Sequence, residues 1–367
     1  MAETPKVIEV GIVLQGGGAL GAYECGGVTA LLELMDAAEA AGQAVALKSV
    51  VGVSIGAINA ACIVGAKDRA DARRRIAALW DDLTLSTPDI WPRAMRRDLS
   101  LFGLPGFYWP RSDYLSVAKW TSYYDTNPLR RTLEKHVDFA ALNASDTAFV
   151  VAAVDVEQGT LKHFSNRKLD DEEPTVIEPR HIMASGALPP QFPWINIDGR
   201  DYWDGGLVDN APLGDAIDAF SHGADVERLL VVIDLYPLRA RLPRTMADVD
   251  DREHELSFGN RVRQDGETAK RINDFVDTIA KLVAVAREGA IAGELAERVA
   301  RARAFKTVKV IDIDMQSRIV EGKPRPEDPS DDEYGLRDFS SQTVRHRRDV
   351  GYRLAREHLA PCFRSAA

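Results

Sequence analysis

The chain has 367 residues, of which 45% are hydrophobic, so it is long and apolar enough for a sizeable folded core and does not read as a disordered chain. Its formal net charge of -10 argues against a nucleic-acid partner and against purely electrostatic adhesion to anionic lipid. Three scattered cysteines, Cys25, Cys62 and Cys362, form neither a C-x-x-C motif nor an even disulfide framework, which fits a reducing, cytoplasmic compartment. Residues 1–6 carry no secretion signal and no apolar stretch reaches membrane-spanning length, so we expect at most transient, peripheral contact with a membrane surface.

The first predicted strand, residues 7–14, runs directly into a glycine-rich loop, Q-G-G-G-A-L-G. Three successive glycines between a strand and a helix expose backbone N–H groups at the positive end of a helix dipole, which makes an anion site. The anion is either a nucleotide phosphate or the oxyanion of a tetrahedral acyl intermediate. The loop satisfies G-x-G-x-x-G, but no acidic residue follows on the next strand and no P-loop lysine follows the glycines. We therefore favour an oxyanion hole made by Gly16, Gly17 and Gly18.

Ser54 follows the second predicted strand, residues 45–51, in the sequence G-V-S-I-G, and a helix-compatible run over 57–64 comes next. A strand, a sharp turn and a helix in that order predict a nucleophile elbow. The flanking Gly52 and Gly56 leave room for strained backbone and are expected to line the site, and the serine hydroxyl is presented at the helix N-terminus. Ser54 is therefore the first candidate nucleophile.

Residues 88–124 interrupt the alternation of strands and helices with nine aromatic residues among four prolines. Two interpretations stay open for this aromatic insertion. It is a satellite core under a long connection, or it is a cap that binds an acyl chain. The next predicted strand covers 148–155.

The sequence D-Y-W-D-G-G-L-V-D-N-A-P at 201–212 combines Asp204 with Gly205 and Gly206, two glycines that bring backbone close to a site. Pro212 is placed to open a helix. Taken alone, D-G-G is also a common turn.

The remaining pattern predicts a C-terminal third that is largely helical. A strand is expected at 229–235, a long helical pattern with one apolar packing face at 268–304, a further strand at 307–313, a mobile Pro- and acid-rich loop at 317–335, and a cationic amphipathic helix at about 338–359.

Strands alternating with helices predict an α/β fold with a mostly parallel sheet covered on both faces. We expect a catalytic core over residues 1–235, which includes the insertion at 88–124. Residues 236–367 would form a helical extension with a further strand near 307–313, packed on that core.

Four segments in one order resemble the patatin-like phospholipases: the loop at 16–21, the elbow at 52–56, the run H-I-M-A-S-G-A-L-P-P-Q-F-P at 181–193, and D-G-G with the following asparagine and proline at 204–212. The resemblance covers about residues 7–235. It implies a three-layer α/β/α fold and a lipid or other acyl-ester substrate, with neither metal nor cofactor.

The same resemblance implies a Ser-Asp dyad without a catalytic histidine. Ser54 would attack the ester carbonyl, Asp204 would take its proton, and N–H groups of the glycine loop would hold the oxyanion. Ser185 resembles a residue that lines the site. The chain departs from the family loop at Leu20, where a basic residue is common, and this puts any preference for anionic lipid in doubt.

A Ser-His-Asp triad is the alternative, and its usual chain order would need a histidine after the acid. The candidates are His222 in a surface turn, His254 in a charged connector, and His346 and His358 on a solvated helix face. None has a local signature, so the dyad is favoured.

Acidic runs at 312–314 and 331–333 lack EF-hand spacing and read as solvated charge, not as a calcium site. The sequence leads to a serine acyl hydrolase that forms an acyl-enzyme. An acyltransferase on the same scaffold and a non-catalytic lipid-binding protein stay open as alternatives. The acyl chain, the head group and the oligomeric state are not specified by the sequence.

Overall fold

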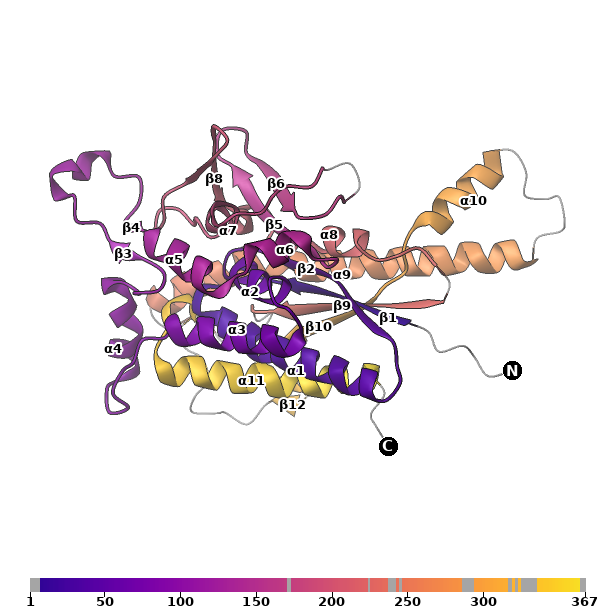
Figure 1. The fold of residues 1–367 in the computed structure, drawn as a ribbon, viewed down its shortest axis with the longest axis horizontal. Coiled ribbons are helices and arrows are strands. Elements are labelled where there is room, and N and C mark those ends of the chain that lie inside the picture. The colour runs from indigo at the N-terminus through magenta and orange to yellow at the C-terminus, as the bar shows by residue number, and fades with distance from the viewer. Residues whose placement is uncertain are drawn as a thin grey trace.

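The computed structural model describes residues 7–169, 173–223, 225–236, 242–243, 246–285, 294–315, 319–320, 323–324 and 335–363. Helices lie on both faces of a mixed, mostly parallel sheet (Figure 1). The predicted three-layer α/β/α fold is confirmed.

Five parallel strands form the centre of the sheet, in the order β10-β9-β1-β2-β5. They are β1 (Val7–Leu14), β2 (Val45–Gly52), β5 (Ala148–Asp155), β9 (Val226–Asp234) and β10 (Lys309–Asp314). All five predicted strands are found within a few residues of their expected bounds. Long apolar runs that are buried on both faces are the pattern of central parallel strands.

An antiparallel part, absent from the sequence prediction, completes the sheet. It contains β6 (Thr160–Ser165), β7 (Ile195–Ile197) and β8 (Arg200–Asp204). Strand β6 pairs with β5. Strand β8 also pairs with β5, and β7 pairs with β8, so the sheet continues in the order β5-β8-β7. Outside this sheet, β3 (Trp109–Pro110) pairs with β4 (Tyr124–Asp125) within the aromatic insertion.

The larger helices are α1 (Gly21–Ala40), α2 (Ile55–Val64), α3 (Arg69–Asp82), α5 (Asn127–His136), α9 (Met246–Val285), α10 (Glu294–Ala304) and α11 (Ser341–Leu359). The shorter α-helices are α4 (Arg93–Asp98), α6 (Phe139–Ala144), α7 (Pro179–Ser185) and α8 (Leu213–Asp218). Short 3₁₀-helices are η1 (Gly18–Leu20), η2 (Leu99–Phe102), η3 (Tyr114–Lys119), η4 (Gly205–Leu207), η5 (Gly335–Arg337) and η6 (Ala360–Cys362). None of the helices within the described ranges is both long and apolar enough to cross a membrane.

Alternating side chains of the central strands divide the core into two clusters. Ile12 and Leu14 of β1 pack in the larger cluster, which includes residues of α1, α2, α3 and α11. Val13 packs in the smaller cluster with residues of α8 and with Ala269 of α9. Because successive strand residues point to opposite faces, these two clusters are the two interfaces of a three-layer fold.

The C-terminal helix α11 belongs to this packing, since it lies directly against α1. A Cβ atom at Gly26 would come within 1.9 Å of the Arg348 carbonyl oxygen, and one at Gly351 within 2.1 Å of the Tyr23 carbonyl oxygen. The two glycines therefore permit a backbone approach that no other residue would allow. Strand β10 also joins the sheet beside β9, so the sheet runs across the expected boundary at residue 235.

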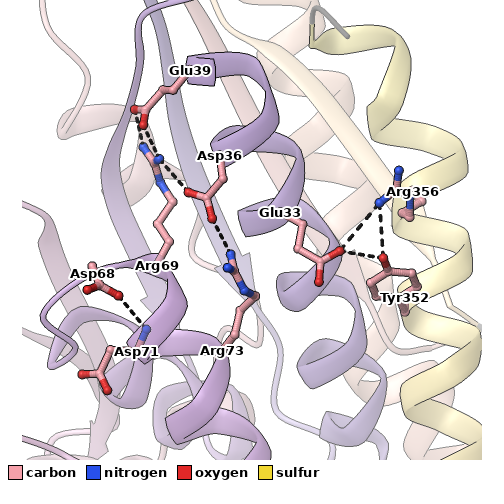
Figure 2. Close-up of polar contacts among 9 residues, drawn as sticks. All are labelled: Glu33, Asp36, Glu39, Asp68, Arg69, Asp71, Arg73, Tyr352 and Arg356. Carbon is pink, nitrogen blue, oxygen red and sulfur yellow. Dashed lines mark hydrogen bonds and ion pairs between the residues drawn. The ribbon is translucent and has the colours of Figure 1, made fainter. Parts of the chain in front are cut away.

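Polar contacts hold α3 and α11 against the acidic face of α1 (Figure 2). Arg69 pairs with Glu39 at 2.7 Å, and Arg73 pairs with Asp36 at 2.6 Å. On the other side, the Tyr352 hydroxyl donates to Glu33 at 2.6 Å. These pairs are partly exposed, so they orient the helices more than they stabilise them.

The long helical pattern expected at 268–304 is found as α10 and the C-terminal half of α9, which begins earlier, at Met246; residues 286–293 lie outside the described residues. The mobile loop expected at 317–335 falls mostly outside them, apart from the short antiparallel pair β11 (Ile319–Val320) and β12 (Lys323–Pro324) and the first residue of η5. The final helix is present as α11.

Candidate active site

Strand register brings Ser54 and Asp204 together. Strand β5 pairs with the end of β2, where Gly52 lies opposite Val151, and with the end of β8, where Asp204 lies opposite Ala153. The two strands approach from opposite directions and end close together along β5. Their next residues meet at the carboxyl edge of the parallel strands, where ligand sites of open α/β sheets form.

Ser54 lies in a strained turn between β2 and α2. Its φ of 54° is in the left-handed region, one of two such values among the non-glycine residues described. A Cβ atom at Gly52 would come within 2.5 Å of the Gly56 backbone, and one at Gly56 within 2.3 Å of the Leu14 carbonyl oxygen. Only glycine permits this close packing. The Ser54 N–H donates to the Ser185 hydroxyl at 3.0 Å, which holds the turn from the side of α7.

Asp204 is buried, with 3% of its surface exposed. The Gly206 N–H donates to Asp204 Oδ1 at 2.8 Å, and the Ser54 hydroxyl lies close enough to this carboxylate to influence its pKa. Burial raises the pKa of Asp204 from 3.8 to about 7, although the Gly206 N–H and the Ser54 hydroxyl both act to lower it. A carboxylate with this pKa is suited to accept a proton at neutral pH.

The glycine loop is held in place through Gly16. Its N–H donates to Asn210 Oδ1 at 2.9 Å, and its carbonyl oxygen accepts from Asn210 Nδ2 at 3.1 Å and from the Tyr236 hydroxyl at 2.7 Å. The Gly16 N–H is therefore occupied, which corrects its expected place among the oxyanion donors. Gly17 and Gly18 line the same cavity as Ser54 and Asp204. The Gly18 φ of +52° favours a glycine, and a Cβ atom there would come within 2.6 Å of the Leu336 carbonyl oxygen.

Ser54 and Asp204 lie at a cavity of about 310 Å³. Most of its wall is apolar, contributed by Leu101, Phe107, Tyr108, Leu188, Phe192, Phe258 and Phe339. A concave, mostly apolar site with a few converging polar groups is the usual form of a small-ligand pocket.

Aromatic contacts join three distant parts of the chain into the cavity wall. Phe192 lies 5.5 Å from Phe107 and 5.2 Å from Tyr108, measured between ring centroids, and Phe339 lies 6.5 Å from Phe107. The Tyr108 hydroxyl donates to the Ser100 carbonyl, so it is satisfied within the insertion. Phe107 and Tyr108 are also buried in the larger core cluster. Part of the aromatic insertion is thus core and cavity wall at once.

Part of the cavity wall comes from the segment 335–339, which Arg347 of α11 anchors. The Arg347 side chain is fully buried and donates to the Gly335 carbonyl oxygen at 2.8 Å. From this segment Arg337 reaches the cavity as the one Lys or Arg of its described wall. Leu20, which stands where the family loop often has a basic residue, is buried.

Five residues expected to line the site do not border the cavity: Gly52, Gly56, Ser185, Gly205 and Gly206. They lie behind it, because each packs against or hydrogen-bonds to the turn that carries Ser54 or Asp204. A Cβ atom at Gly205, for example, would come within 2.4 Å of the Ala152 carbonyl oxygen. Their contribution is to the shape of the two turns.

Of the four histidines weighed for a triad, His254 is placed differently from expectation. It lies on α9, not in a connector, and it borders the cavity with its ring 6.1 Å from that of Phe258. His222 lies between α8 and β9, and His346 and His358 lie on α11, none of them at the cavity.

The sequence analysis assigned no role to two polar residues that hold the glycine loop in place, Asn210 and Tyr236. Asn210 belongs to the D-G-G segment, and its hydrogen bonds to Gly16 span 194 positions of sequence. Tyr236 follows β9 directly, at the carboxyl end of a parallel strand, and this position is the signal that could have found it.

Within the part of the chain that the structure describes, no group of three His, Cys, Asp or Glu side chains is placed to hold a metal ion. Asp312 and Asp314 lie on β10, whereas the acidic run at 331–333 lies outside the described residues.

The fold and the site define an α/β protein with a serine elbow beside a buried aspartate. Residues 12–217, more than half of the chain, match the patatin-like phospholipases, and the protein belongs to this family of lipid hydrolases. None of the curated proteins compared with the chain matches it.

Among solved structures, the chain is similar to VipD from Legionella pneumophila, with 15% identity and a TM-score of 0.39, over 97% of this chain and 67% of that one. It is also similar to the ExoU-SpcU heterodimer of the Pseudomonas aeruginosa type III secretion system, with 14% identity and a TM-score of 0.36. That match covers 98% of this chain but 52% of the other, so the chain spans about half its length.

Proposed function

We propose that this protein hydrolyses an acyl ester of a lipid with Ser54 as nucleophile and Asp204 as general base. The observation that carries the proposal is the placement of Ser54 beside a buried Asp204, whose pKa burial raises to about 7, at one cavity with apolar walls. A nucleophile beside a base is the minimum that covalent acyl transfer requires.

In the first half-reaction, Ser54 Oγ bonds to the ester carbonyl carbon while its proton passes to Asp204. The negative charge on the former carbonyl oxygen is held by the N–H groups of Gly17 and Gly18, at the positive end of the α1 region. Collapse of this intermediate breaks the bond to the alcohol, which leaves with the proton from Asp204. The acyl group stays on Ser54.

In the second half-reaction, Asp204 takes a proton from water as the water oxygen attacks the acyl-enzyme. The second tetrahedral intermediate collapses, the fatty acid leaves, and Ser54 regains a proton from Asp204. An alcohol in place of that water would give an acyltransferase, so the two activities differ only in the acceptor.

The apolar wall supports an acyl chain as the bound part of the substrate. Arg337 provides the positive charge that Leu20 does not, and we expect it to face a polar part of the ester. An alcohol-side phosphate, as in a phospholipid, is the chemistry that a guanidinium group favours.

Labelling with a fluorophosphonate, combined with hydrolysis of p-nitrophenyl esters, tests this function. We expect one label per chain on Ser54, and we expect Ser54→Ala to remove both labelling and hydrolysis while its melting temperature stays close to that of the wild type. Labelling without hydrolysis, but with transfer to an added alcohol, would identify an acyltransferase. An unlabelled Ser54 in a folded protein would leave only a non-catalytic lipid-binding role.

A further inference from the structure

The aromatic insertion has an exposed side that packing does not explain. Of the 21 large apolar side chains that are exposed among the described residues, nine lie between positions 90 and 123. Exposed apolar residues scattered singly are ordinary, but a local concentration marks an interaction surface. We call this set the insertion surface; it consists of Ile90, Met95, Leu101, Phe102, Trp109, Tyr114, Leu115, Val117 and Tyr123.

The insertion surface is distinct from the part of the insertion that forms core. Phe107 and Tyr108 are 4% and 7% exposed, whereas Phe102 is 76% exposed and Leu115 on η3 is 106% exposed. Figure 1 shows α4 and the β3–β4 loop projecting from one end of the molecule, opposite the far ends of α9 and α10. The side chains of the insertion surface are thus carried outward on this projection.

The charge of the insertion differs from that of the whole chain. Residues 88–124 hold five Lys or Arg residues and three Asp residues, a net charge of +2 in a chain of -10. Arg97 pairs with Asp98 at 2.6 Å and Arg111 with Asp113 at 2.7 Å, and Arg111 also lies over the Trp120 ring at 5.4 Å. The exposed Lys119 ends η3. Trp, Tyr and cationic side chains beside exposed aliphatic ones are the composition that binds at a bilayer interface. An anionic surface would attract this end and repel the rest.

The insertion surface is continuous with the active site. Leu101 and Tyr123 belong to it and also border the cavity that contains Ser54. A lipid surface in contact with these residues would therefore lie at the cavity mouth.

We propose that the insertion surface docks the protein on an anionic lipid bilayer, with the cavity mouth facing the lipid. The choice of a bilayer rests on the proposed function, in which the substrate is a lipid. Docking itself needs no catalysis. Leu115 and Val117 enter the headgroup region, and the exposed Lys119 beside them lies at the lipid phosphates.

Sedimentation with sucrose-loaded vesicles tests the proposal. Ser54→Ala is used as the parent so that no lipid is hydrolysed, and the vesicles contain phosphatidylcholine with or without phosphatidylglycerol. We expect Leu115→Glu/Val117→Glu in this parent to lower the partition coefficient by at least about tenfold on the anionic vesicles, because burial of one aliphatic side chain alone is worth about that factor.

Leu282→Glu in the same parent is the matched control, since Leu282 is 58% exposed near the far end of α9. We expect it to bind as the parent does. The proposal would be overturned if the double variant bound the vesicles as well as the parent does, or if the Leu282 control lost as much binding as the double variant. It would also be overturned if binding did not depend on phosphatidylglycerol. A dimer that the double variant dissociates, with unchanged vesicle binding, would assign the surface to a second copy of the chain and also overturn it.

The same double substitution with Ser54 intact separates docking from catalysis. Neither Leu115 nor Val117 borders the cavity, so hydrolysis of soluble p-nitrophenyl acetate is expected to match the wild type, while release of fatty acid from vesicles falls with binding. An inert wild-type protein that still sediments with anionic vesicles would remove the proposed function and leave docking in place.

Discussion

The floor and the wall of the cavity are built in different ways. The floor consists of Gly17, Gly18, Ser54 and Asp204, which sit on tight turns at the ends of buried strands. The wall consists of apolar side chains from the insertion, from 188–192, from α9 and from 335–339. Backbone geometry fixes the floor, because its glycines permit no other residue. The wall depends on packing between distant segments, which tolerates substitution by residues of similar volume. We infer that the floor sets the reaction and the wall sets the substrate.

The largest expected effect comes from changing Asp204, the proposed base in the floor. Asp204→Asn keeps an oxygen to accept the Gly206 N–H but cannot take the proton of Ser54. We expect kcat/KM for p-nitrophenyl butyrate to fall by about 10³-fold or more, as for other members of catalytic dyads and triads. A loss below tenfold would show that another group is the base.

The same substitution should raise stability, and the effect should depend on pH. The folded state raises the pKa of Asp204 from 3.8 to about 7, so ionisation of this carboxyl costs stability as the pH rises through that interval. Removing the charge then stabilises the protein above neutral pH and has little effect below pH 4, the ordinary range of the carboxyl group. Melting temperatures of Asp204→Asn and wild type at both ends of the interval measure the difference, and a lower melting temperature of the variant at alkaline pH would contradict this account.

The pH dependence of the wild type tests the floor without a substitution. Since Asp204 must be ionised to act as a base, log kcat/KM is expected to rise with a slope near one up to a pH of about 7 and then level off. Two pH units below the plateau the loss is about a hundredfold. A flat profile between pH 5 and 8, roughly the interval in which histidine and raised carboxyl groups titrate, would contradict the assignment.

In the wall, Phe192→Ala is expected to impair long-chain esters more than short ones. Each buried CH₂ is worth about 0.8 kcal/mol, so the loss of three methylene contacts lowers kcat/KM by roughly fiftyfold on a long-chain ester, with little change on acetate. Trp109→Ala is the control, because Trp109 is aromatic and half exposed but does not border the cavity. If the Phe192 variant lost kcat/KM equally for all chain lengths and had a lower melting temperature, the role of Phe192 would be structural packing and not acyl-chain binding.

The smallest effect is expected at His254, which borders the cavity from α9. Because Asp204 already contacts Ser54, we predict that His254→Ala lowers kcat by less than tenfold, with His346→Ala on α11 as a control outside the cavity. Steady-state kinetics would show it. A loss of about 10⁴-fold at His254 would restore a histidine-dependent triad.

The difference between floor and wall also explains what the sequence could predict. The turn at Ser54 and the glycine loop are local, since strand, glycines and helix follow one another within a few residues. The fold class was equally accessible, because long apolar strands such as β1 and β9 carry their pattern alone. Strands β7 and β8 have no such apolar pattern, because β7 has only three residues and β8 has the polar sequence R-D-Y-W-D. Their antiparallel pairing beside β5 is decided by tertiary contacts.

The sequence could not predict the residues of the cavity wall, because their positions also depend on tertiary contacts. Nothing near Phe339 in the sequence indicates that it lies against Phe107, and the anchoring of its segment by Arg347 depends on how α11 packs on α1. His254 was expected in a connector because charge dominates its neighbourhood, whereas it lies on α9 at the cavity, with its ring 6.1 Å from that of Phe258.

Direct detection of an acyl-enzyme tests the central claim, that Ser54 is acylated with Asp204 as base. The protein is mixed with a p-nitrophenyl ester, quenched in acid during turnover, and digested for mass spectrometry. We predict the acyl mass on the peptide that contains Ser54, in amounts that match the burst of p-nitrophenol, and none in Asp204→Asn on the same timescale. The claim would be contradicted if the acyl group were found on another residue. It would also be contradicted if the ester were hydrolysed without a burst and without modification of Ser54, and if Ser54→Ala kept its activity.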